Sequence, residues 1–290
     1  MTDMDKPGLG NDAARIAWVT GASSGIGRAL ALRLADDGWK VVASARGQQA
    51  LDALAMERPG AIFPLALDVT DREAVRGTID DIEGRIGAIE LAVFSAGTYM
   101  RDKALAFDTD SFSAMLNLNV LGTVHCLTAI AETMARRGRG QIAVTSSVAG
   151  YSGLPGGGAY GATKAALLNL CESFYPELEA ANVRLSIINP GFVDTPLTRM
   201  NDFPMPFLIS ADAAADHIVR GLQKGRFEIV FPWKMAFATK LLRLLPYPLV
   251  FAITRRMLRQ DARIVETADH QQKSSPADHG KLCDGSTCPP

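Results

Sequence analysis

The fold is decided by residues 16–30, IAWVTGASSGIGRAL, in which an apolar run passes through a glycine-rich turn into an amphipathic stretch. The run at 16–20 is typical of a strand, and the stretch from Gly25 has the spacing of a helix. A strand, a glycine-rich turn and a helix N-terminus in this order form an anion site, because free backbone N–H groups and the helix dipole face the ligand. Glycine also lets the backbone approach a pyrophosphate closely. The segment is therefore predicted to bind the pyrophosphate of a dinucleotide.

The same turn fits other interpretations. Gly21, Ser23 and Gly25 match the G-x-S-x-G nucleophile elbow of serine hydrolases, which has the same strand–turn–helix setting. An elbow here would follow the very first strand, would leave Gly27 unexplained and would have no evident downstream His as its base. A plain tight turn without a ligand is another alternative. A P-loop is excluded, because no Gly-Lys-Ser/Thr sequence follows the glycines.

Short apolar runs alternate with amphipathic stretches from residue 15 to about residue 230. The predicted strands are 16–20, 40–44, 62–67, 91–95, 141–146, 184–189 and 227–231. The predicted helices include 25–37, 71–84, 111–135 and 160–180. The strand runs lack clean polar–apolar alternation, which indicates burial on both faces, and strand–helix alternation is typical of a parallel sheet. The sequence therefore predicts one doubly wound, Rossmann-type α/β domain of about seven strands over 15–232, with a helical extension at 233–263.

Composition excludes several other classes. The chain has 290 residues, of which 48% are hydrophobic, and 30 Lys and Arg balance 31 Asp and Glu. This length is ample for a sizeable core, and the near-zero net charge argues against general disorder and against a basic nucleic-acid binder. Four cysteines do not make a disulfide framework in a chain this long, so a reducing, cytoplasmic compartment is expected.

The two ends differ from the rest in composition. Residues 1–14 are polar and lack the apolar core of a secretory signal, and residues 264–290 are polar and contain Pro and Gly. Both are expected to be disordered. Cys283 and Cys288 lie in the second of these segments, and no cluster with metal-ligand spacing is found, so no metal is expected.

The end of the second predicted strand bears on which dinucleotide is bound. A site for NAD usually has an acidic residue there, which binds the ribose 2′-hydroxyl. This strand ends without Asp or Glu and is followed by Arg46, whose guanidinium suits a 2′-phosphate. Ser44 and Ser23 are candidates for additional hydroxyl donors. The sequence therefore favours NADP over NAD, the alternative being that Arg46 is an ordinary solvated residue.

A second group of residues suits proton transfer. Tyr160 and Lys164 are one helical turn apart, and Ser147 lies thirteen residues before Tyr160. A free phenol has a pKa near ~10 and is a poor base at neutral pH, but a neighbouring ammonium favours the phenolate. The pair is thus a candidate general acid/base for an alcohol or carbonyl. Taken alone, Tyr-x-x-x-Lys is common and also fits a surface pair.

With its neighbouring motifs, the chain resembles the short-chain dehydrogenase/reductase family over about residues 15–200. The matching motifs are Thr20-Gly-x-x-x-Gly-x-Gly27, Asp68-Val69, Asn119-Val-Leu-Gly122, Ser146-Ser147-Val-Ala-Gly150, Tyr160-x-x-x-Lys164 and Asn189-Pro-Gly-Phe-Val-Asp-Thr195-Pro. Their order and spacing make the resemblance specific.

The resemblance implies catalytic roles for four residues. Tyr160 would give a proton to the substrate carbonyl oxygen during reduction, or take it back during oxidation. Ser147 would hydrogen-bond the same oxygen. Lys164 would bind the nicotinamide ribose, and Asn119 would hold a water that links Lys164 to solvent.

It also implies a set of cofactor contacts, with Asp68 and Val69 at the adenine and Val193 and Thr195 at the carboxamide. Together with the candidates from the second strand, the expected cofactor-binding residues are Gly21, Ser23, Ser24, Gly25, Ile26, Gly27, Ser44, Arg46, Asp68, Val69, Ser95, Ala96, Gly97, Tyr160, Lys164, Pro190, Gly191, Val193 and Thr195. One departure is Phe94-Ser95-Ala96-Gly97, where family members usually have Asn-Asn-Ala-Gly. It puts in doubt the hydrogen bonds that brace the sheet there, for which Ser95 is a candidate substitute.

The substrate side is expected to come from loops after the fourth, fifth and sixth strands, as in the family. The candidates are Tyr99, Tyr151, Leu154, Phe192, Met200 and Phe203. An apolar lining suits a hydrophobic ketone, aldehyde or secondary alcohol, although any of these residues also fits a place in the core.

The extension 233–263 is basic and apolar, with seven Lys and Arg against Asp261 alone. A membrane span is disfavoured, because charges and Pro246 and Pro248 interrupt every apolar run. A helix lying on a membrane surface and a helix that contacts a second subunit or covers the substrate both fit the composition.

These observations predict an NADP(H)-dependent oxidoreductase that interconverts a hydrophobic carbonyl compound and its alcohol, with Tyr160 as general acid/base. The alternatives are a cofactor-binding regulatory protein without turnover, and an epimerase or dehydratase on the same scaffold. By analogy with the family, the chain is expected to form a homodimer or homotetramer. It is expected in the cytoplasm, with peripheral membrane contact through 233–263 and no nucleic-acid partner.

Overall fold

The computed structural model describes residues 15–200 and 204–258. The chain divides into two compact units, one ending at Leu244 and one beginning at Leu245. The predictions for 1–14 and 264–290, and the substrate candidate Phe203, lie outside the described residues. Residues 233–244, placed by sequence in the extension, belong to the first unit.

The first unit is built on a seven-stranded parallel sheet in the order β3-β2-β1-β4-β5-β6-β9. The strands are β1 Ile16–Thr20, β2 Lys40–Ala45, β3 Ile62–Ala66, β4 Ile89–Phe94, β5 Gly140–Thr145, β6 Val183–Pro190 and β9 Glu228–Phe231. A separate pair joins β7 Val193–Asp194 to β8 Ile209–Ser210. This order reverses direction between β1 and β4, so a crevice opens at the carboxyl ends of these strands. The predicted doubly wound sheet is confirmed.

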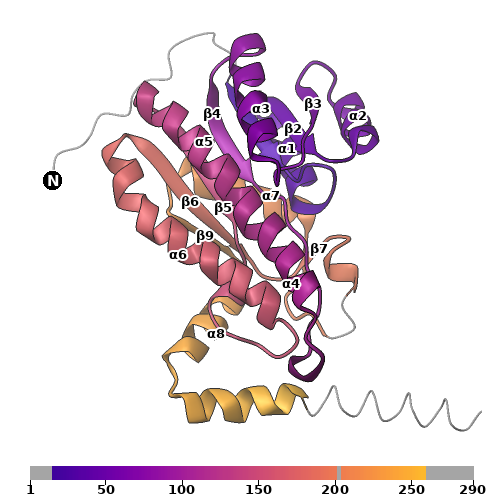
Figure 1. Ribbon diagram of the computed structural model, residues 1–290, viewed down its shortest axis with the longest axis vertical. Helices are drawn as coiled ribbons and strands as arrows, with labels where there is room; N and C mark the ends of the chain where they lie inside the picture. Colours follow the sequence, from indigo (N-terminus) through magenta and orange to yellow (C-terminus); the bar gives the residue numbers. More distant parts are fainter. Residues whose placement is uncertain (1–14, 201–203, 259–290) are drawn as a thin grey trace, which may run out of the picture. The chain divides into compact units, whose positions relative to one another are not determined.

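Helices cover both faces of the sheet (Figure 1). The helices are α1 Gly25–Asp36, α2 Gln48–Glu57, α3 Arg72–Arg85, α4 Thr109–Leu116, α5 Gly122–Arg137, α6 Gly158–Ala180, α7 Ala211–Gln223 and α8 Trp233–Leu244, with short helical turns η1 Ala104–Ala106, η2 Asn117–Leu121, η3 Val148–Gly150 and η4 Thr198–Met200. One core lies between the sheet and α3, α5 and α6, and a second between the sheet and α1, α2 and α7.

Burial follows from this layering. Every residue of β1 is buried, as expected for a strand covered by helices on both sides. Trp18 packs edge-to-face on Phe94 in the first core, with ring centroids 5.5 Å apart. Pro64 lies within β3, at the edge of the sheet, where its missing N–H costs no ladder hydrogen bond on the outer side.

The predicted helix 111–135 is divided in the structure. It begins at Thr109, where the Asp108 side chain accepts from the N–H groups of Asp110 and Ser111, and a π-helical turn, η2, separates α4 from α5. Such turns are frequent at functional sites, and η2 contains Asn119. Within the described residues, the run Thr109–Arg137 is long and apolar enough to cross a membrane, but α5 packs its apolar face onto the sheet and α3.

The second unit contains one described helix, residues 247–258. Its first turn is closed by the carbonyl of Pro246, which accepts from the N–H groups of Leu249 and Val250.

Candidate active site

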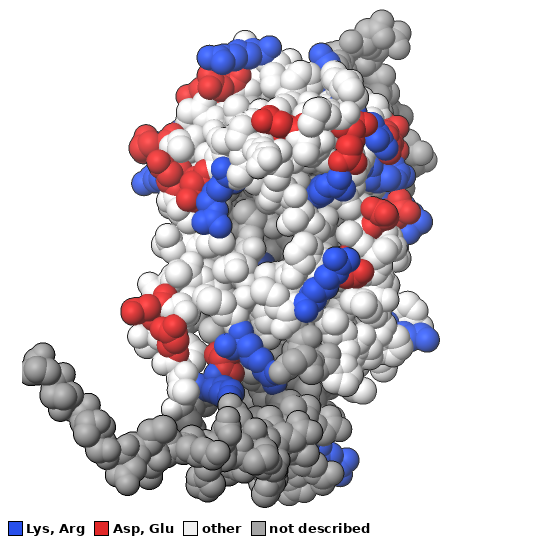
Figure 2. All heavy atoms as spheres, turned by 90° about the vertical axis from the view of Figure 1, so that its right-hand side faces the viewer, with Lys and Arg blue, Asp and Glu red and all other residues white. Residues whose placement is uncertain are grey.

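A cleft with a volume of about 390 Å³ lies at the carboxyl ends of the central strands. Figure 2 looks onto a hollowed face of the molecule, with acidic and basic side chains spread around the hollow. The cleft is lined by Gly21, Ser23, Ser24, Gly25, Ile26, Gly27, Ala45, Arg46, Gly47, Leu67, Asp68, Val69, Ser95, Ala96, Gly97, Thr98, Leu118, Thr145, Ser146, Ser147, Tyr160, Lys164, Pro190, Gly191, Val193, Thr195, Pro196, Leu197 and Thr198. All expected cofactor-binding residues except Ser44 are therefore on one surface.

The glycine turn is packed so tightly that side chains would not fit. A Cβ on Gly21 would lie 2.6 Å from the backbone nitrogen of Ala96, and Gly21 has φ of +69°. A Cβ on Gly27 would lie 2.4 Å from the carbonyl oxygen of Gly21. The turn thus brings the N-terminus of α1 to the cleft, where its first N–H groups and the helix dipole favour an anion.

The end of β2 presents one basic side chain to the cleft. Arg46 is exposed and lines the cleft, and no acidic residue stands at the end of the strand. Ser44 behaves differently from its prediction, because it is fully buried and its hydroxyl accepts a hydrogen bond from the Trp18 indole at 3.0 Å. Its side chain points into the core, so its hydroxyl is not available as a donor in the cleft.

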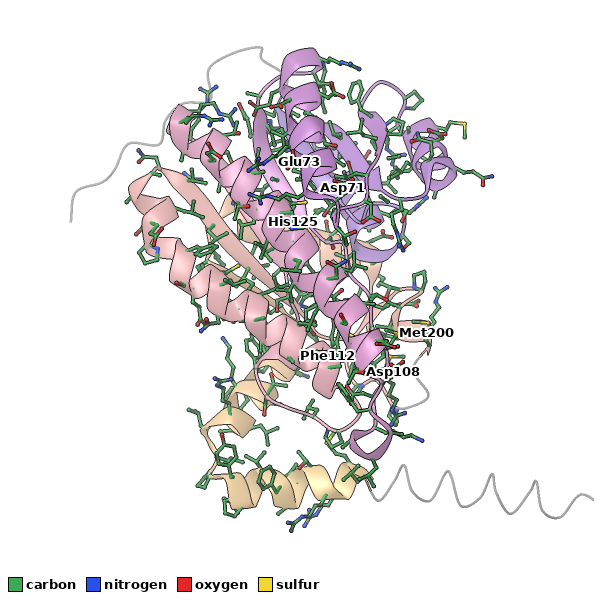
Figure 3. The ribbon with its side chains drawn as sticks, in the orientation of Figure 1. Asp71, Glu73, Asp108, Phe112, His125 and Met200 are labelled. Atoms are coloured by element: carbon green, nitrogen blue, oxygen red, sulfur yellow. The ribbon has the colours of Figure 1, made fainter. Side chains whose placement is uncertain are left out.

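The loop after β3 is held in shape by its own hydrogen bonds. The Asp68 carboxylate accepts from the N–H and the hydroxyl of Thr70, at 2.9 and 2.7 Å. These bonds, together with the charge of Arg46, lower the pKa of Asp68. The His125 ring on α5 contacts the Val69 carbonyl oxygen, at 3.2 Å from Nδ1 (Figure 3). In the same figure Asp71 and Glu73 mark the start of α3, where Asp71 caps the helix.

The segment with the unusual Phe94-Ser95 sequence is braced from β1. The Ser95 backbone N–H donates to the Thr20 hydroxyl at 3.2 Å. Ser95 was the expected substitute for the missing Asn, and this bond uses its backbone N–H rather than its side chain. Beyond it, Gly97 lies against the Asn119 amide, leaving no room for a larger residue without displacement.

Three polar side chains meet on the wall of the cleft. The Ser147 hydroxyl donates to the Pro190 carbonyl at 3.4 Å, accepts from the N–H of Ala149 at 3.1 Å, and is close enough to the Tyr160 phenol to lower its pKa. The Lys164 ammonium is 5.5 Å from the centre of the Tyr160 ring and donates to the Thr145 carbonyl at 3.0 Å. The one-turn spacing on α6 thus places Lys164 beside the ring, as predicted.

Ser146, next to Ser147, faces the other way. Its hydroxyl donates to the Lys164 carbonyl at 2.8 Å, which ties the end of β5 to α6. This agrees with the sequence spacing, which selects Ser147 as the residue for the chemistry.

Asn119 lies behind the cleft and is completely buried. Its amide donates to the Thr98 carbonyl at 2.9 Å and to the Thr163 hydroxyl at 3.2 Å, and its Oδ1 accepts from the Thr98 N–H at 2.8 Å. It therefore joins η2, the loop after β4, and α6 next to Tyr160.

Burial shifts the pKa values of Tyr160 and Lys164 in opposite directions. Removal from water raises the pKa of Tyr160 to about 12, and the neighbouring Ser147 hydroxyl opposes this rise. Removal from water lowers the pKa of Lys164 to about 8. The sequence argument expected the ammonium to lower the pKa of the phenol, whereas burial dominates here. The phenol is thus protonated at neutral pH and is ready to donate.

The N-terminus of α6 is capped from a distant loop. The Asp102 carboxylate accepts from the Ala159 N–H at 2.5 Å, one residue before Tyr160. No local pattern could identify this residue, since 57 positions separate it from Ala159. It also borders a second cavity of about 150 Å³, lined by Met100, Arg101, Asp102, Ala106, Phe107, Asp108, Ser111, Phe112, Met115 and Ala159.

The expected substrate residues are only partly brought to the site. Tyr99 packs edge-to-face on Tyr160, with ring centroids 5.2 Å apart. Tyr151 is buried, its hydroxyl donates to Glu228, and it does not line the cleft. Neither described cavity includes Leu154, Phe192 or the exposed Met200, which Figure 3 places on η4. The sequence did not predict the second cavity. It also did not single out three residues that line the cleft, Thr98, Leu118 and Thr145.

The residues of the cleft fit a dinucleotide. The glycine turn forms a cradle that a Cβ would fill, a helix N-terminus faces the cleft, and Arg46 provides a cation. Among the described residues, no group of three or more His, Cys, Asp or Glu side chains suits a metal ion.

Comparisons with known proteins agree with this geometry. The family model described as short chain dehydrogenase matches residues 15–203. An uncharacterized oxidoreductase of Myxococcus xanthus is 39% identical over 246 residues, covering 84% of this chain and 97% of that protein. The 3-oxoacyl-(acyl-carrier-protein) reductase FabG of Thermotoga maritima is 31% identical over 187 residues, covering 63% of this chain and 76% of that protein.

Solved structures share the fold. A short-chain dehydrogenase from Streptomyces avermitilis has a TM-score of 0.72 at 24% identity, covering 86% of this chain and 99% of that chain. The structure of ElxO with NADP bound has a TM-score of 0.69 at 24% identity, covering 75% of this chain and 98% of that chain. The chain therefore belongs to the short-chain dehydrogenase/reductase family, whose members are oxidoreductases that bind NAD(P).

Proposed function

We propose that this protein is an NADP(H)-dependent oxidoreductase that interconverts a hydrophobic ketone or aldehyde and its alcohol. The observation that carries the proposal is the meeting of Ser147, Tyr160 and Lys164 on one wall of the cleft that the glycine turn and Arg46 also line. A proton donor and a dinucleotide cradle on one surface are what carbonyl reduction needs.

A dinucleotide held by the glycine turn and Arg46 would supply or accept the hydride. Tyr160 donates its phenolic proton to the carbonyl oxygen, which its raised pKa allows at neutral pH. Ser147 hydrogen-bonds the same oxygen and stabilises the negative charge that develops there. Lys164 lies beside the phenol, and its positive charge stabilises the phenolate left after the transfer.

Asn119 and Asp102 hold the elements that position Tyr160, Ser147 and Lys164. Asn119 fixes the distance between the loop after β4 and α6 through its bonds to Thr98 and Thr163. Asp102 holds the first turn of α6, from which Tyr160 projects. In oxidation the same residues act in reverse, with Tyr160 accepting the proton of the alcohol.

The preference for NADP rests on Arg46 and on the absence of an acid at the end of β2. A guanidinium binds a phosphate by charge-assisted, bidentate hydrogen bonds, which the 2′-hydroxyl of NAD does not offer. The bound NADP in ElxO supports the same choice.

A substitution at Arg46 tests this preference. We expect Arg46→Ala to raise the KM for NADPH by about tenfold or more, with little change in the KM for NADH, because the two cofactors differ at the 2′-position. Arg76, a surface arginine on α3 outside the cleft, supplies the matched control variant Arg76→Ala. Equal effects on both cofactors would contradict the assignment of Arg46.

A hydrophobic substrate is favoured by the second cavity, whose lining includes Met100, Phe107, Phe112 and Met115. The FabG relative is named as a reductase of a 3-oxoacyl group, a ketone on an acyl chain. We propose a substrate of this kind, with a ketone or aldehyde on an apolar chain.

The decisive experiment measures NADPH oxidation with a panel of lipophilic ketones and aldehydes, with wild type beside Tyr160→Phe. We expect wild-type turnover and a fall in kcat of about a thousandfold or more in the variant, while NADPH binding, followed by nucleotide fluorescence, is retained. A wild-type rate no higher than that of the variant on every substrate would favour the alternative, a regulatory protein that binds the cofactor without turnover.

An epimerase or dehydratase is the remaining alternative, and it is identified by conversion of an alcohol substrate without net change in NADPH. We further propose a homodimer or homotetramer located in the cytoplasm, which mass photometry and cell fractionation test.

A further inference from the structure

Helix α8 presents an apolar stripe to solvent. Trp233, Phe237, Leu241 and Leu244 recur at helical spacing, and they are 69%, 64%, 47% and 80% exposed. A soluble monomer gains nothing from exposing so many large apolar side chains in a row, so this stripe is a contact surface.

Contacts with the first unit hold α8 in place and so determine the orientation of the stripe. Lys240 forms an ion pair with Glu228 at the edge of the sheet. Arg243 donates to the carbonyl oxygen of Tyr151 at 2.6 Å, and Ala236 and Thr239 are buried. The helix therefore cannot rotate its apolar stripe inward without breaking these contacts.

The charge of this part of the chain indicates what the stripe contacts. Helix α8 has three basic residues, Lys234, Lys240 and Arg243, and no acidic residue. The helix 247–258 of the second unit, described by itself, also exposes large apolar residues, among them Tyr247 and Phe251. Apolar faces with aromatic residues and only basic charges are typical of helices that lie in the interface of an anionic bilayer.

We propose that α8 is a docking surface for an anionic lipid bilayer, in which its apolar stripe is buried among the acyl chains near the headgroups. The helix has 12 residues and is about 18 Å long, which is too short to span a hydrocarbon core of about 30 Å. It therefore lies in the plane of the interface.

The test is sedimentation of the full-length protein with phosphatidylcholine vesicles, with and without phosphatidylserine. We expect binding to the vesicles that contain phosphatidylserine, weakened by high salt because the attraction is partly electrostatic. The triple variant Trp233→Gln/Phe237→Gln/Leu241→Gln should lose about tenfold or more of the bound fraction. The matched control Met56→Gln/Leu105→Gln removes two exposed apolar residues elsewhere in the unit and should bind as wild type does.

Tryptophan fluorescence locates the contact. Trp18 is fully buried and the Trp39 ring lies under the Arg15 guanidinium, so a blue shift on adding vesicles reports on the exposed Trp233. Trp233→Phe should keep the binding and lose the shift. Circular dichroism confirms that the variants fold.

Two results would overturn the proposal. One is absence of vesicle binding, or binding that the triple variant retains in full. The other is self-association of the wild type that the triple variant abolishes without any vesicle binding, which assigns the stripe to a second copy of the chain.

Discussion

At the scale of single residues, the site depends on how water is excluded from Tyr160 and Lys164. Both side chains lie on the wall of the cleft, and burial disfavours the charged form of each. The result is a neutral phenol beside an ammonium that releases its proton more easily than a solvated lysine does.

This pair predicts opposite pH dependences for the two directions of the reaction. Reduction requires the protonated phenol and the ammonium, and Lys164 loses its proton as the pH rises through about 8. We expect kcat for carbonyl reduction to fall above that pH, and kcat for alcohol oxidation to rise, because oxidation needs Tyr160 as a base. Initial rates in both directions from pH 6 to 10 check this, and a reduction rate that stays constant to pH 10 would contradict it.

At the scale of elements, α6 is the part of the fold that positions the chemistry. It carries Tyr160 and Lys164, and its first turn is held by Asp102 from the loop after β4. Capping an N-terminus in this way satisfies a backbone N–H that the helix itself leaves without a partner.

Removal of this cap should disturb catalysis more than cofactor binding. We expect Asp102→Ala to lower the free energy of unfolding by about 1 kcal/mol and to reduce kcat, with little effect on the KM for NADPH. Asp102→Asn keeps an acceptor oxygen and should restore most of both quantities. Urea unfolding and steady-state kinetics of the two variants distinguish a positioning role from a general loss of stability. A general loss of stability would lower the free energy of unfolding and kcat to the same extent.

Sequence periodicity locates most elements but not their junctions. The seven strands of the sheet were all predicted, with ends that differ by one or two residues, because buried strands are apolar runs whatever their partners are. The break between α4 and α5 was not predicted. The π-helical turn there contains Asn119, whose amide donates to Thr98 and Thr163, two residues distant from it in sequence.

At the scale of the whole molecule, the buried Lys164 should reduce stability. The folded-state pKa of Lys164 is lowered from 10.5 to about 8, so below that pH the folded protein keeps a charge that burial disfavours. Between about pH 8 and 10.5 the unfolded chain binds more protons than the folded one, and the stability contributed by this group rises with pH.

The variant Lys164→Met has no such group, so its stability is the reference. We expect Lys164→Met to be more stable than wild type at pH 7.5, and the difference to shrink by roughly 2 kcal/mol by pH 10. Urea unfolding of both proteins at each pH measures it. A difference that does not change with pH would show that Lys164 is not neutralised in the folded state over this range.

Charge at this scale is also unevenly distributed. The net charge of the whole chain is near zero, but the segment from Trp233 to Leu258 contains no acidic residue. The structure divides this segment at Leu244 and assigns α8 to the catalytic unit. The helix is thus a part of the folded enzyme with one anchored face and one apolar face.

The sequence by itself determined the strands, the glycine turn and the Tyr160–Lys164 pair, because each is a pattern of residues close together along the chain. Only the tertiary structure decided where side chains point. Ser44 and Tyr151 were predicted in the site, but both are buried and hydrogen-bond Trp18 and Glu228, since a buried polar group needs a hydrogen bond. Asp102 joins the site for the same reason, and partners so distant in sequence leave no local pattern to reveal them.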